Sequence, residues 1–210
     1  MTTPSAAMQS PAQPRSKYDQ RREEVMHAAA AVFADKGFHG ASTQDIADRL
    51  GMKQGSLYYY YPSKEAALEA VCLYGVQQNV ARLKQIVAAD LTLREKIRQI
   101  VYSQIYGLQT HCAHLIVFSQ QRRFLPDEAH ARIRVEGRKY QKLLESMLRK
   151  AKTAGVVAAD IDIVLATRAL TGLCNSVAPL YQQDPSLDIE RIAQQYARLF
   201  YAGVRPEVPA

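Results

Sequence analysis

The residues best suited to binding chemistry lie between positions 42 and 64, where hydroxyl, amide and ammonium groups follow one another closely. The hydroxyl of Ser56 can bond a base edge or a phosphate, and the ammonium of Lys64 can pair with a phosphate. The hydroxyls of Tyr58 and Tyr59 can reach phosphates, and their rings can contact thymine methyl groups. This stretch is therefore a candidate surface for contacts to nucleic acid.

The elements that must position these groups are two short helices separated by a tight turn. Thr43 can cap the first helix, because its hydroxyl accepts a hydrogen bond from an N–H two or three residues further on. Gly51 follows, where a helix end needs a residue that tolerates a positive φ angle. We expect the second helix over residues 54–60, and Pro62 ends it because the residue before a proline is pushed out of the α region. In such a helix-turn-helix the second helix enters the major groove of DNA.

The composition of the 210-residue chain is that of an ordinary globular protein, with 48% hydrophobic and 22% charged residues. It contains no run of about 18 consecutive apolar residues, so we expect no membrane-spanning segment. Residues 1–15 lack the apolar region of a secretory signal. Cys72, Cys112 and Cys174 lie far apart, which fits a reducing cytosol and predicts a cytoplasmic protein.

The positive charge of the chain is unevenly distributed. Its net charge of +7 suggests a polyanionic partner. Residues 1–64 hold eight Lys and Arg against six Asp and Glu, whereas residues 122–152 hold ten against four. The most basic segment therefore lies outside the helix-turn-helix.

Helical periodicity continues along the rest of the chain, and no alternation of period two persists, so we predict an all-α protein. The expected helices are residues 18–36, 63–87, 93–110, 111–123, 126–154, 162–181 and 188–202.

A specific order of residue types carries a family resemblance, through Gly37, Phe38, Thr43, Asp45, Ile46, Ala47, Gly51, Gly55, Leu57, Tyr58, Ser63, Lys64 and Glu65. This order resembles the N-terminal domain of the TetR family of transcriptional regulators. The resemblance implies a homodimer that binds a palindromic operator in double-stranded DNA and is released by a small-molecule effector. It implies neither an enzymatic activity nor a cofactor.

The resemblance also implies a division of the chain and a set of DNA contacts. We expect a disordered arm over residues 1–15, a helix-turn-helix domain over 16–62, an effector-binding and dimerisation domain over 63–204, and a tail over 205–210. Base or groove contacts are implied for Gln44, Lys53, Gln54, Gly55, Ser56 and Tyr59, and phosphate contacts for Thr43, Tyr58, Tyr60 and Lys64.

The sequence departs from the family pattern at two places. Lys53 stands where the family often has a serine or threonine, and a lysine cannot cap the second helix. Tyr60 and Tyr61 stand where the family usually has histidine and phenylalanine, so the Tyr61 hydroxyl needs a partner in the core.

The basic segment, with Asn175 downstream, resembles a subgroup that senses CoA thioesters of fatty acids or steroid fragments. The predicted effector residues are Val101, Ile105, Leu108, Phe118, Arg122, Arg123, Arg134, Arg138, Tyr140, Leu143, Met147, Leu170, Cys174 and Asn175. Ile116, Arg132 and Lys139 belong to the same apolar and basic sets. The alternatives are a solvated basic helix face and a regulator of an efflux system that senses a hydrophobic drug or metabolite.

Other classes of function have less support from the residues. His111, Cys112 and His114 could suggest a metal, but a structural zinc site usually needs four ligands, so none is expected. An enzyme is disfavoured because no Ser/His/Asp group, glycine-rich phosphate loop or helically spaced acid pair occurs. A helical protein-interaction module and an activating regulator remain as alternatives.

Overall fold

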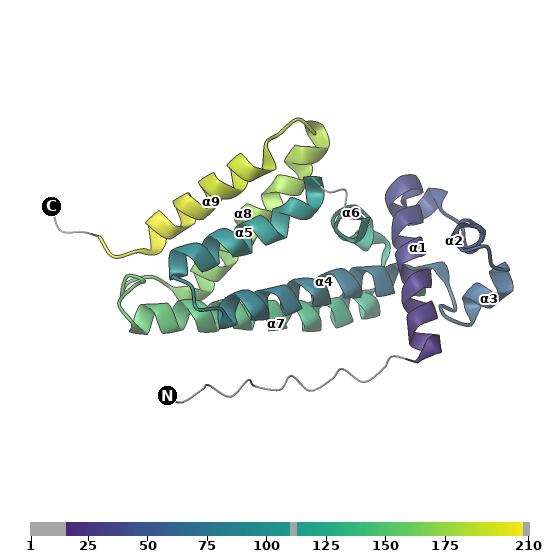
Figure 1. The fold of residues 1–210 in the computed structure, drawn as a ribbon, viewed down its shortest axis with the longest axis horizontal. Coiled ribbons are helices and arrows are strands. Elements are labelled where there is room, and N and C mark those ends of the chain that lie inside the picture. The colour runs from purple at the N-terminus through teal and green to yellow at the C-terminus, as the bar shows by residue number, and fades with distance from the viewer. Residues whose placement is uncertain (1–15, 110–112, 208–210) are drawn as a thin grey trace, which may run out of the picture.

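The computed structural model describes residues 16–109 and 113–207, and every regular element within these two ranges is a helix (Figure 1). This confirms the predicted all-α class. The elements are α1 (Lys17–Gly40), α2 (Thr43–Arg49), α3 (Gln54–Tyr58), α4 (Lys64–Ala88), α5 (Leu93–Gln109), α6 (Ala113–Gln121), the 3-10 helix η1 (Arg122–Phe124), α7 (Asp127–Thr153), α8 (Ile163–Gln183) and α9 (Ile189–Val204).

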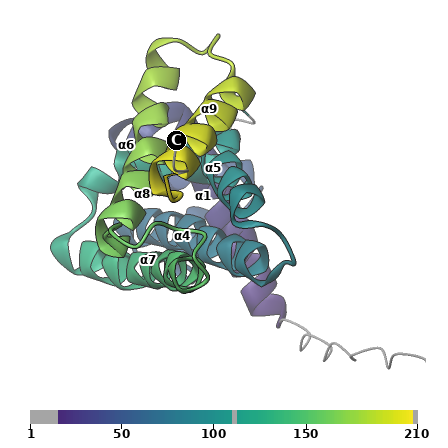
Figure 2. The same ribbon diagram turned by 90° about the vertical axis from the view of Figure 1, so that its left-hand side faces the viewer.

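Helices α1, α2 and α3 gather at one end of the molecule, and we call them the head (Figure 1). The remaining helices form the body, in which α4 and α7 lie side by side. Helix α5 packs against α8 and α9, and the three form a second layer over α4 and α7 (Figure 2). Helix α4 leaves the head and continues through the body, so it links the two parts directly.

Helix α2 begins one position earlier than predicted. Its N-cap is Ser42 rather than Thr43, because the Ser42 hydroxyl accepts a hydrogen bond from the Asp45 N–H at 3.1 Å. The Asp45 carboxylate accepts from the Ser42 N–H at 2.8 Å in return, which completes a capping box. Hydrogen bonds from Lys36 and then Ser42 lower the pKa of Asp45 to about 2. The hydroxyl of Thr43 is thus left for other contacts.

The end of α1 agrees with the predicted stop at Gly37. This residue has a φ angle of +69°, which glycine adopts without steric strain, and a last helical turn follows as far as Gly40. Phe38 in that turn is buried and returns to the core of the head.

Two clusters of buried apolar side chains make up the interior of the described chain. The head cluster joins Phe33 and Leu57 to Leu68 of α4 and Val117 of α6. The body cluster includes the second half of α4 together with α5, α7, α8 and α9. The predicted domain boundary after residue 62 falls inside the head cluster, and it stays a prediction.

Helix α8 differs from the expectation about membrane segments. Within the described residues, the stretch Ile163–Tyr181 is long and apolar enough to cross a membrane by length and composition alone, with a mean hydropathy of 1.3. The sequence-based expectation missed it because Arg168 interrupts the apolar run. A helix in the core of a globular protein meets the same criterion, and α8 packs on α5, α7 and α9.

Candidate ligand cavity and DNA-contact surface

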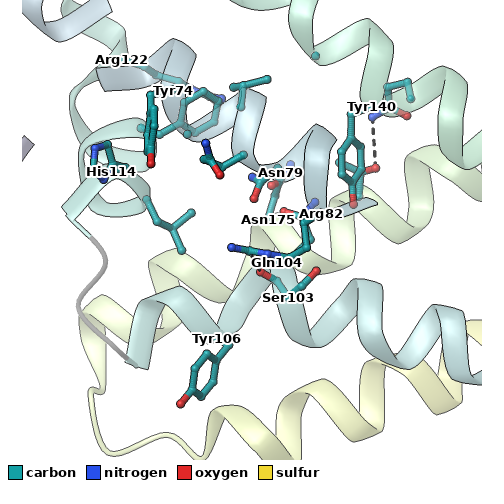
Figure 3. A pocket seen from close by; sticks show the side chains of 18 of the residues that line it. Tyr74, Asn79, Arg82, Ser103, Gln104, Tyr106, His114, Arg122, Tyr140 and Asn175 are labelled. Carbon is teal, nitrogen blue, oxygen red and sulfur yellow. Dashed lines mark hydrogen bonds between the residues drawn. The ribbon is translucent and has the colours of Figure 1, made fainter. Parts of the chain in front are cut away.

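A cavity of about 760 Å³ lies within the body, bounded by α4, α5, α6, α7 and α8 (Figure 3). One lining residue, His27, comes from α1 of the head. The described lining residues are His27, Tyr74, Gly75, Val76, Gln78, Asn79, Arg82, Tyr102, Ser103, Gln104, Tyr106, His114, Leu115, Phe118, Arg122, Gly137, Tyr140, Gln141, Thr171 and Asn175.

The structure brings four of the predicted effector residues together at this cavity: Phe118, Arg122, Tyr140 and Asn175. Most of the predicted apolar residues instead pack into the body cluster, because a helical apolar stripe is buried against neighbouring helices more often than against a void. These are Val101, Ile105, Leu143, Met147, Leu170 and Cys174. Ile116 is half-buried and does not line the cavity. The side chain of Leu108 lies outside the described residues.

The predicted basic residues of α7 also lie away from the cavity. Arg134 and Arg138 are exposed and are absent from its lining, and the Arg123 guanidinium lies 4.9 Å from the centroid of the Phe124 ring. The remaining basic side chains of this set form ion pairs, Arg132 with Glu69 of α4 and Lys139 with Glu136. The described part of the basic segment is therefore largely a solvent-facing surface, and Arg122 is its one basic residue among the described residues that line the cavity.

Sequence reasoning missed the polar lining that α4 and α5 supply. Asn79 and Arg82 of α4 face the cavity together with Ser103 and Gln104 of α5. The Arg82 guanidinium donates a hydrogen bond to the Ser103 carbonyl at 3.1 Å. The available signal was the polar set Gln78, Asn79 and Arg82, at three- and four-residue steps within the helix predicted over residues 63–87.

Tyr140 is the most deeply placed polar group of the lining. Burial raises the pKa of its phenol well above the ordinary value, and a hydrogen bond with Gln104 opposes that rise. Near it, the Gln141 amide donates to the Thr171 hydroxyl at 3.2 Å, which joins α7 to α8 (Figure 3). The phenol is therefore neutral at physiological pH and can act as a hydrogen-bond donor.

Three rings from three helices meet where the cavity approaches the head. His27, Tyr74 and His114 have ring centroids 4.7 to 5.1 Å apart. Burial, and secondly the neighbouring His27, lower the pKa of His114 to about 4. His114 is thus uncharged at neutral pH, and its Nε2 lies 3.2 Å from the sulfur of Met26.

The predicted metal candidates receive no support from the described chain. No group of three or more His, Cys, Asp or Glu side chains that could hold a metal ion occurs within its described ranges. His114 belongs to the ring cluster, while His111 and Cys112 lie outside the described residues.

The predicted DNA contacts from α2 and α3 form a connected surface on the head. The Gln54 amide donates to the Thr43 hydroxyl at 2.7 Å, and that hydroxyl lies 3.3 Å from the Tyr58 hydroxyl. Tyr58 and Tyr59 are 46% and 71% exposed. A Cβ atom added at Gly55 would meet no atom within 4 Å, so the surface there is open.

The start of α3 lacks a side-chain cap, as expected from the lysine at position 53. Lys53 is its N-cap residue, makes no side-chain capping bond and is exposed, as is Ser56. At the end of α3, Tyr60 is half-buried and stacks on Tyr18 with a centroid distance of 5.4 Å. The Tyr61 hydroxyl donates to the Arg22 carbonyl at 3.2 Å, which supplies the partner that a buried tyrosine needs.

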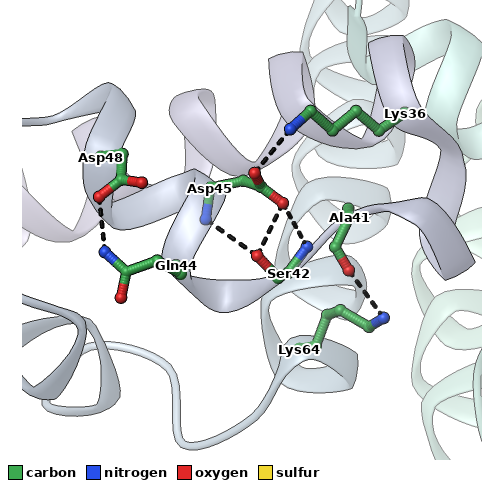
Figure 4. Close-up of polar contacts among 7 residues, drawn as sticks. All are labelled: Lys36, Ala41, Ser42, Gln44, Asp45, Asp48 and Lys64. Atoms are coloured by element: carbon green, nitrogen blue, oxygen red, sulfur yellow. Dashed lines mark hydrogen bonds and ion pairs between the residues drawn. The ribbon is translucent and has the colours of Figure 1, made fainter.

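Two predicted DNA contacts are engaged within the head (Figure 4). The Lys64 ammonium donates to the carbonyls of Phe38 and Ala41 at 2.8 and 3.0 Å, so it caps the end of α1. An ammonium has three N–H donors, which leaves one for a phosphate. The Gln44 amide donates to Asp48 on the same helix. Lys64, at the start of α4, thus fixes the end of α1 through two hydrogen bonds, in addition to its predicted contact with DNA.

A second connection between head and body runs through α6 and η1. The Phe38 N–H donates to the side-chain oxygen of Gln121 at 3.1 Å. The next residue, Arg122, lines the cavity with its guanidinium 4.8 Å from the centroid of the Phe118 ring. Phe124 stacks on Phe38 at 5.5 Å between ring centroids. One short segment therefore touches both the cavity and the end of α1.

Comparisons with known proteins agree with this architecture. Residues 90–204 match the family described as "Tetracyclin repressor-like, C-terminal domain", and residues 25–71 match "Bacterial regulatory proteins, tetR family". A curated relative, the HTH-type transcriptional repressor KstR2 of Mycolicibacterium smegmatis, is 25% identical over 94% of this chain and 95% of its own length.

Two solved structures share the fold over most of both chains. FadR from Bacillus subtilis in complex with stearoyl-CoA has a TM-score of 0.78 and 21% identity, and the match covers 87% of this chain and 99% of that one. AibR in complex with isovaleryl coenzyme A and operator DNA has a TM-score of 0.73 and 22% identity, over 86% and 98%. From these matches and the geometry of the head, the chain belongs to the TetR family of bacterial regulatory proteins and is a DNA-binding transcriptional regulator, not an enzyme.

Proposed function

We propose that this regulator is a repressor that binds a palindromic operator as a homodimer and leaves it when a small molecule enters the cavity. The observation that carries the proposal is the position of His27, which belongs to α1 of the head and lines the cavity. A molecule in the cavity can therefore touch the helix that supports α2 and α3. If it binds one orientation of the head more tightly, it shifts the population toward that orientation.

The proposed DNA contacts are those that the sequence predicts in α2, α3 and the start of α4. The open surface at Gly55 and the exposure of Tyr59 support a close approach of α3 to the major groove. The head accordingly comprises residues 16–62 and the effector and dimerisation part residues 63–204. The chain acts in the cytoplasm, where its operator lies.

The proposed dimer surface is the outer face of α8 and α9. Leu165 and Leu199 on these helices are 62% and 59% exposed. Between Leu165 and Leu180, small exposed residues, Ala169 and Gly172, leave room for a second helix to approach. A second copy of the chain on this face would account for the apolar character of α8, and a twofold dimer reads two half-sites.

The proposed effector class is an acyl-CoA thioester. Two exposed arginines, Arg82 and Arg122, line the cavity, and the planar fork of a guanidinium suits phosphate oxygens. The structures of FadR and AibR contain stearoyl-CoA and isovaleryl coenzyme A, respectively. Of the basic residues expected to hold phosphates, Arg122 of η1 keeps that role in this proposal, and Arg82 of α4 joins it. A hydrophobic drug without acidic groups would leave Arg82 and Arg122 without a charged partner, whereas the phosphates of a CoA thioester can pair with them.

Fluorescence anisotropy with labelled DNA from upstream of the gene for this chain tests the DNA role. We expect tight binding at low salt and a steep loss of affinity as salt rises, because lysines and arginines release counterions from the phosphates. Equal affinity for that fragment and for a shuffled duplex would contradict specific operator binding. Light scattering on the purified chain tests the dimer, and a monomer at micromolar concentration would contradict it.

A further inference from the structure

We infer that the cavity selects an effector whose acyl group is an aromatic ring with an oxygen substituent, rather than a saturated fatty chain. This inference rests on the proposed function, because it names the effector class of the same cavity. Two properties of the lining carry it: the ring cluster at the end near the head, and two unpaired amides, Asn79 on α4 and Asn175 on α8.

The end of the cavity near the head is walled by aromatic side chains. His27, Tyr74 and His114 pack against one another, and Phe118, four residues after His114 on α6, also lines the cavity. Pairs of aromatic rings gain about 0.5 to 1.5 kcal/mol beyond the burial of their area. A planar ring on the ligand can extend this cluster, whereas a saturated chain gains only the burial term.

The middle of the cavity offers hydrogen bonds that the protein does not use. Among the residues that the structure describes, the amides of Asn79 and Asn175 make no hydrogen bond. Both line the cavity, as Arg82 and Gln104 do (Figure 3). Covering such a group with methylenes costs about 1 to 3 kcal/mol, because it loses water and gains no partner. A hydroxyl or carbonyl on the ligand would supply that partner.

The two regions are connected by one helix. Tyr74 and Asn79 are five residues apart on α4, about 7.5 Å along the helix axis, and both line the cavity. A ring that packs on Tyr74 and carries an oxygen substituent could therefore direct that oxygen along α4 toward Asn79. Aliphatic side chains contribute little, since Val76 and Leu115 alone represent them among the described lining residues. A long alkyl chain would therefore lie against aromatic rings, amides and hydroxyls rather than against aliphatic side chains.

Calorimetry with four thioesters of equal acyl carbon number tests the inference: 4-hydroxyphenylacetyl-, phenylacetyl-, cyclohexylacetyl- and octanoyl-CoA. We expect the 4-hydroxyphenylacetyl ester to bind most tightly, about tenfold or more tighter than the octanoyl ester. Octanoyl or cyclohexylacetyl binding equal to that of the aromatic esters would overturn the inference and leave the thioester proposal standing. If no thioester binds, the proposed effector class fails, and free 4-hydroxyphenylacetate against free octanoate then tests the ring preference by itself.

A pair of variants tests the role of the amide. Asn79→Leu replaces an unpaired amide in the lining with an aliphatic side chain, so we expect octanoyl-CoA to gain affinity relative to 4-hydroxyphenylacetyl-CoA. The control Gln85→Leu makes a similar change at an exposed position of α4 outside the lining, and should leave that ratio unchanged. An unchanged ratio in Asn79→Leu, with the fold intact by circular dichroism, would show that this amide does not select the ligand.

Discussion

The side-chain oxygen of Gln121 accepts a hydrogen bond from the Phe38 N–H at 3.1 Å, and this contact joins the last turn of α6 to the end of α1. Its neighbour Arg122 lines the cavity. A shift of Gln121 and Arg122 on ligand binding would therefore move the end of α1, where the chain leads into α2 and α3.

The first prediction concerns this contact. Gln121→Leu removes the acceptor, so an effector should release the variant from its operator less than it releases the parent. We expect the factor by which the effector weakens operator binding to be about fivefold smaller in the variant. Gln121→Glu keeps an acceptor oxygen at the same position and should restore the coupling. Anisotropy titrations of bound operator with effector measure both. Parent-like release in Gln121→Leu would mean that the coupling runs through other contacts, such as α4.

A second prediction addresses the surface that faces DNA. Gly55→Ala places a methyl group in open space within the protein, so stability should change little, but the methyl would lie between α3 and the groove. We expect operator affinity to fall by about tenfold, or 1.4 kcal/mol. The matched control is Gly40→Ala, where the new Cβ meets Lys36 Cβ at an ordinary 3.7 Å and the affinity should be retained. If Gly55→Ala binds the operator with full affinity, α3 does not approach the groove closely at this position.

A third prediction separates the two roles of Lys64. Its ammonium donates to two carbonyls at the end of α1 and lies 4.4 Å from the centroid of the Phe38 ring. Lys64→Met should lower the free energy of unfolding by about 1 to 2 kcal/mol, because the carbonyls lose a charged donor. Urea denaturation without DNA measures this effect. If the free energy of unfolding of Lys64→Met equals that of the parent and only operator binding weakens, the main role of Lys64 is the phosphate contact.

The sequence predicted most of the fold because its signals were local. Ser63 caps α4, Asp188 caps α9 and Gly155 has a φ angle of +71° after α7, each as the residue type indicates. The N-cap of α2 could not be assigned from the sequence, since the hydroxyls of Ser42 and Thr43 can both accept a hydrogen bond from a backbone N–H. The reciprocal bonds between Ser42 and Asp45 in the structure decide for Ser42.

The cavity was far less predictable than the helices. Arg134 and Arg138 look like phosphate ligands in the sequence, but the rotation of α7 turns them to solvent. Asn79 and Arg82 look like a solvated face, yet they line the cavity together with residues of α5 and α8. Which face of a helix is covered depends on packing between distant segments, and one sequence holds no local signal for it.

A fourth prediction follows from the low pKa of His114. Its pKa in the folded chain is about 4, below the ordinary 6.5, so the unfolded chain takes up the proton first as the pH falls. Stability is therefore complete above pH 6.5 and declines between 6.5 and 4. With solvent screening taken into account, we expect a loss of about 1 kcal/mol between pH 7.5 and 5.0.

Urea denaturation at the two pH values measures this loss, and His114→Phe keeps a ring at the position without the titrating group. The variant should lose less stability than the parent over the same pH interval. Equal losses in parent and variant would assign the pH dependence to other groups.

Release from the operator requires thermodynamic coupling between the cavity and the head, and a reciprocal binding measurement tests this coupling most directly. Calorimetry gives the Kd of 4-hydroxyphenylacetyl-CoA, or of the tightest ligand found, with free protein and with the protein–operator complex, and anisotropy gives the operator Kd with and without that ligand. We predict that operator and ligand weaken each other by the same factor, about 5- to 150-fold. A ligand that binds the cavity with the same Kd in the presence and absence of operator would contradict the account.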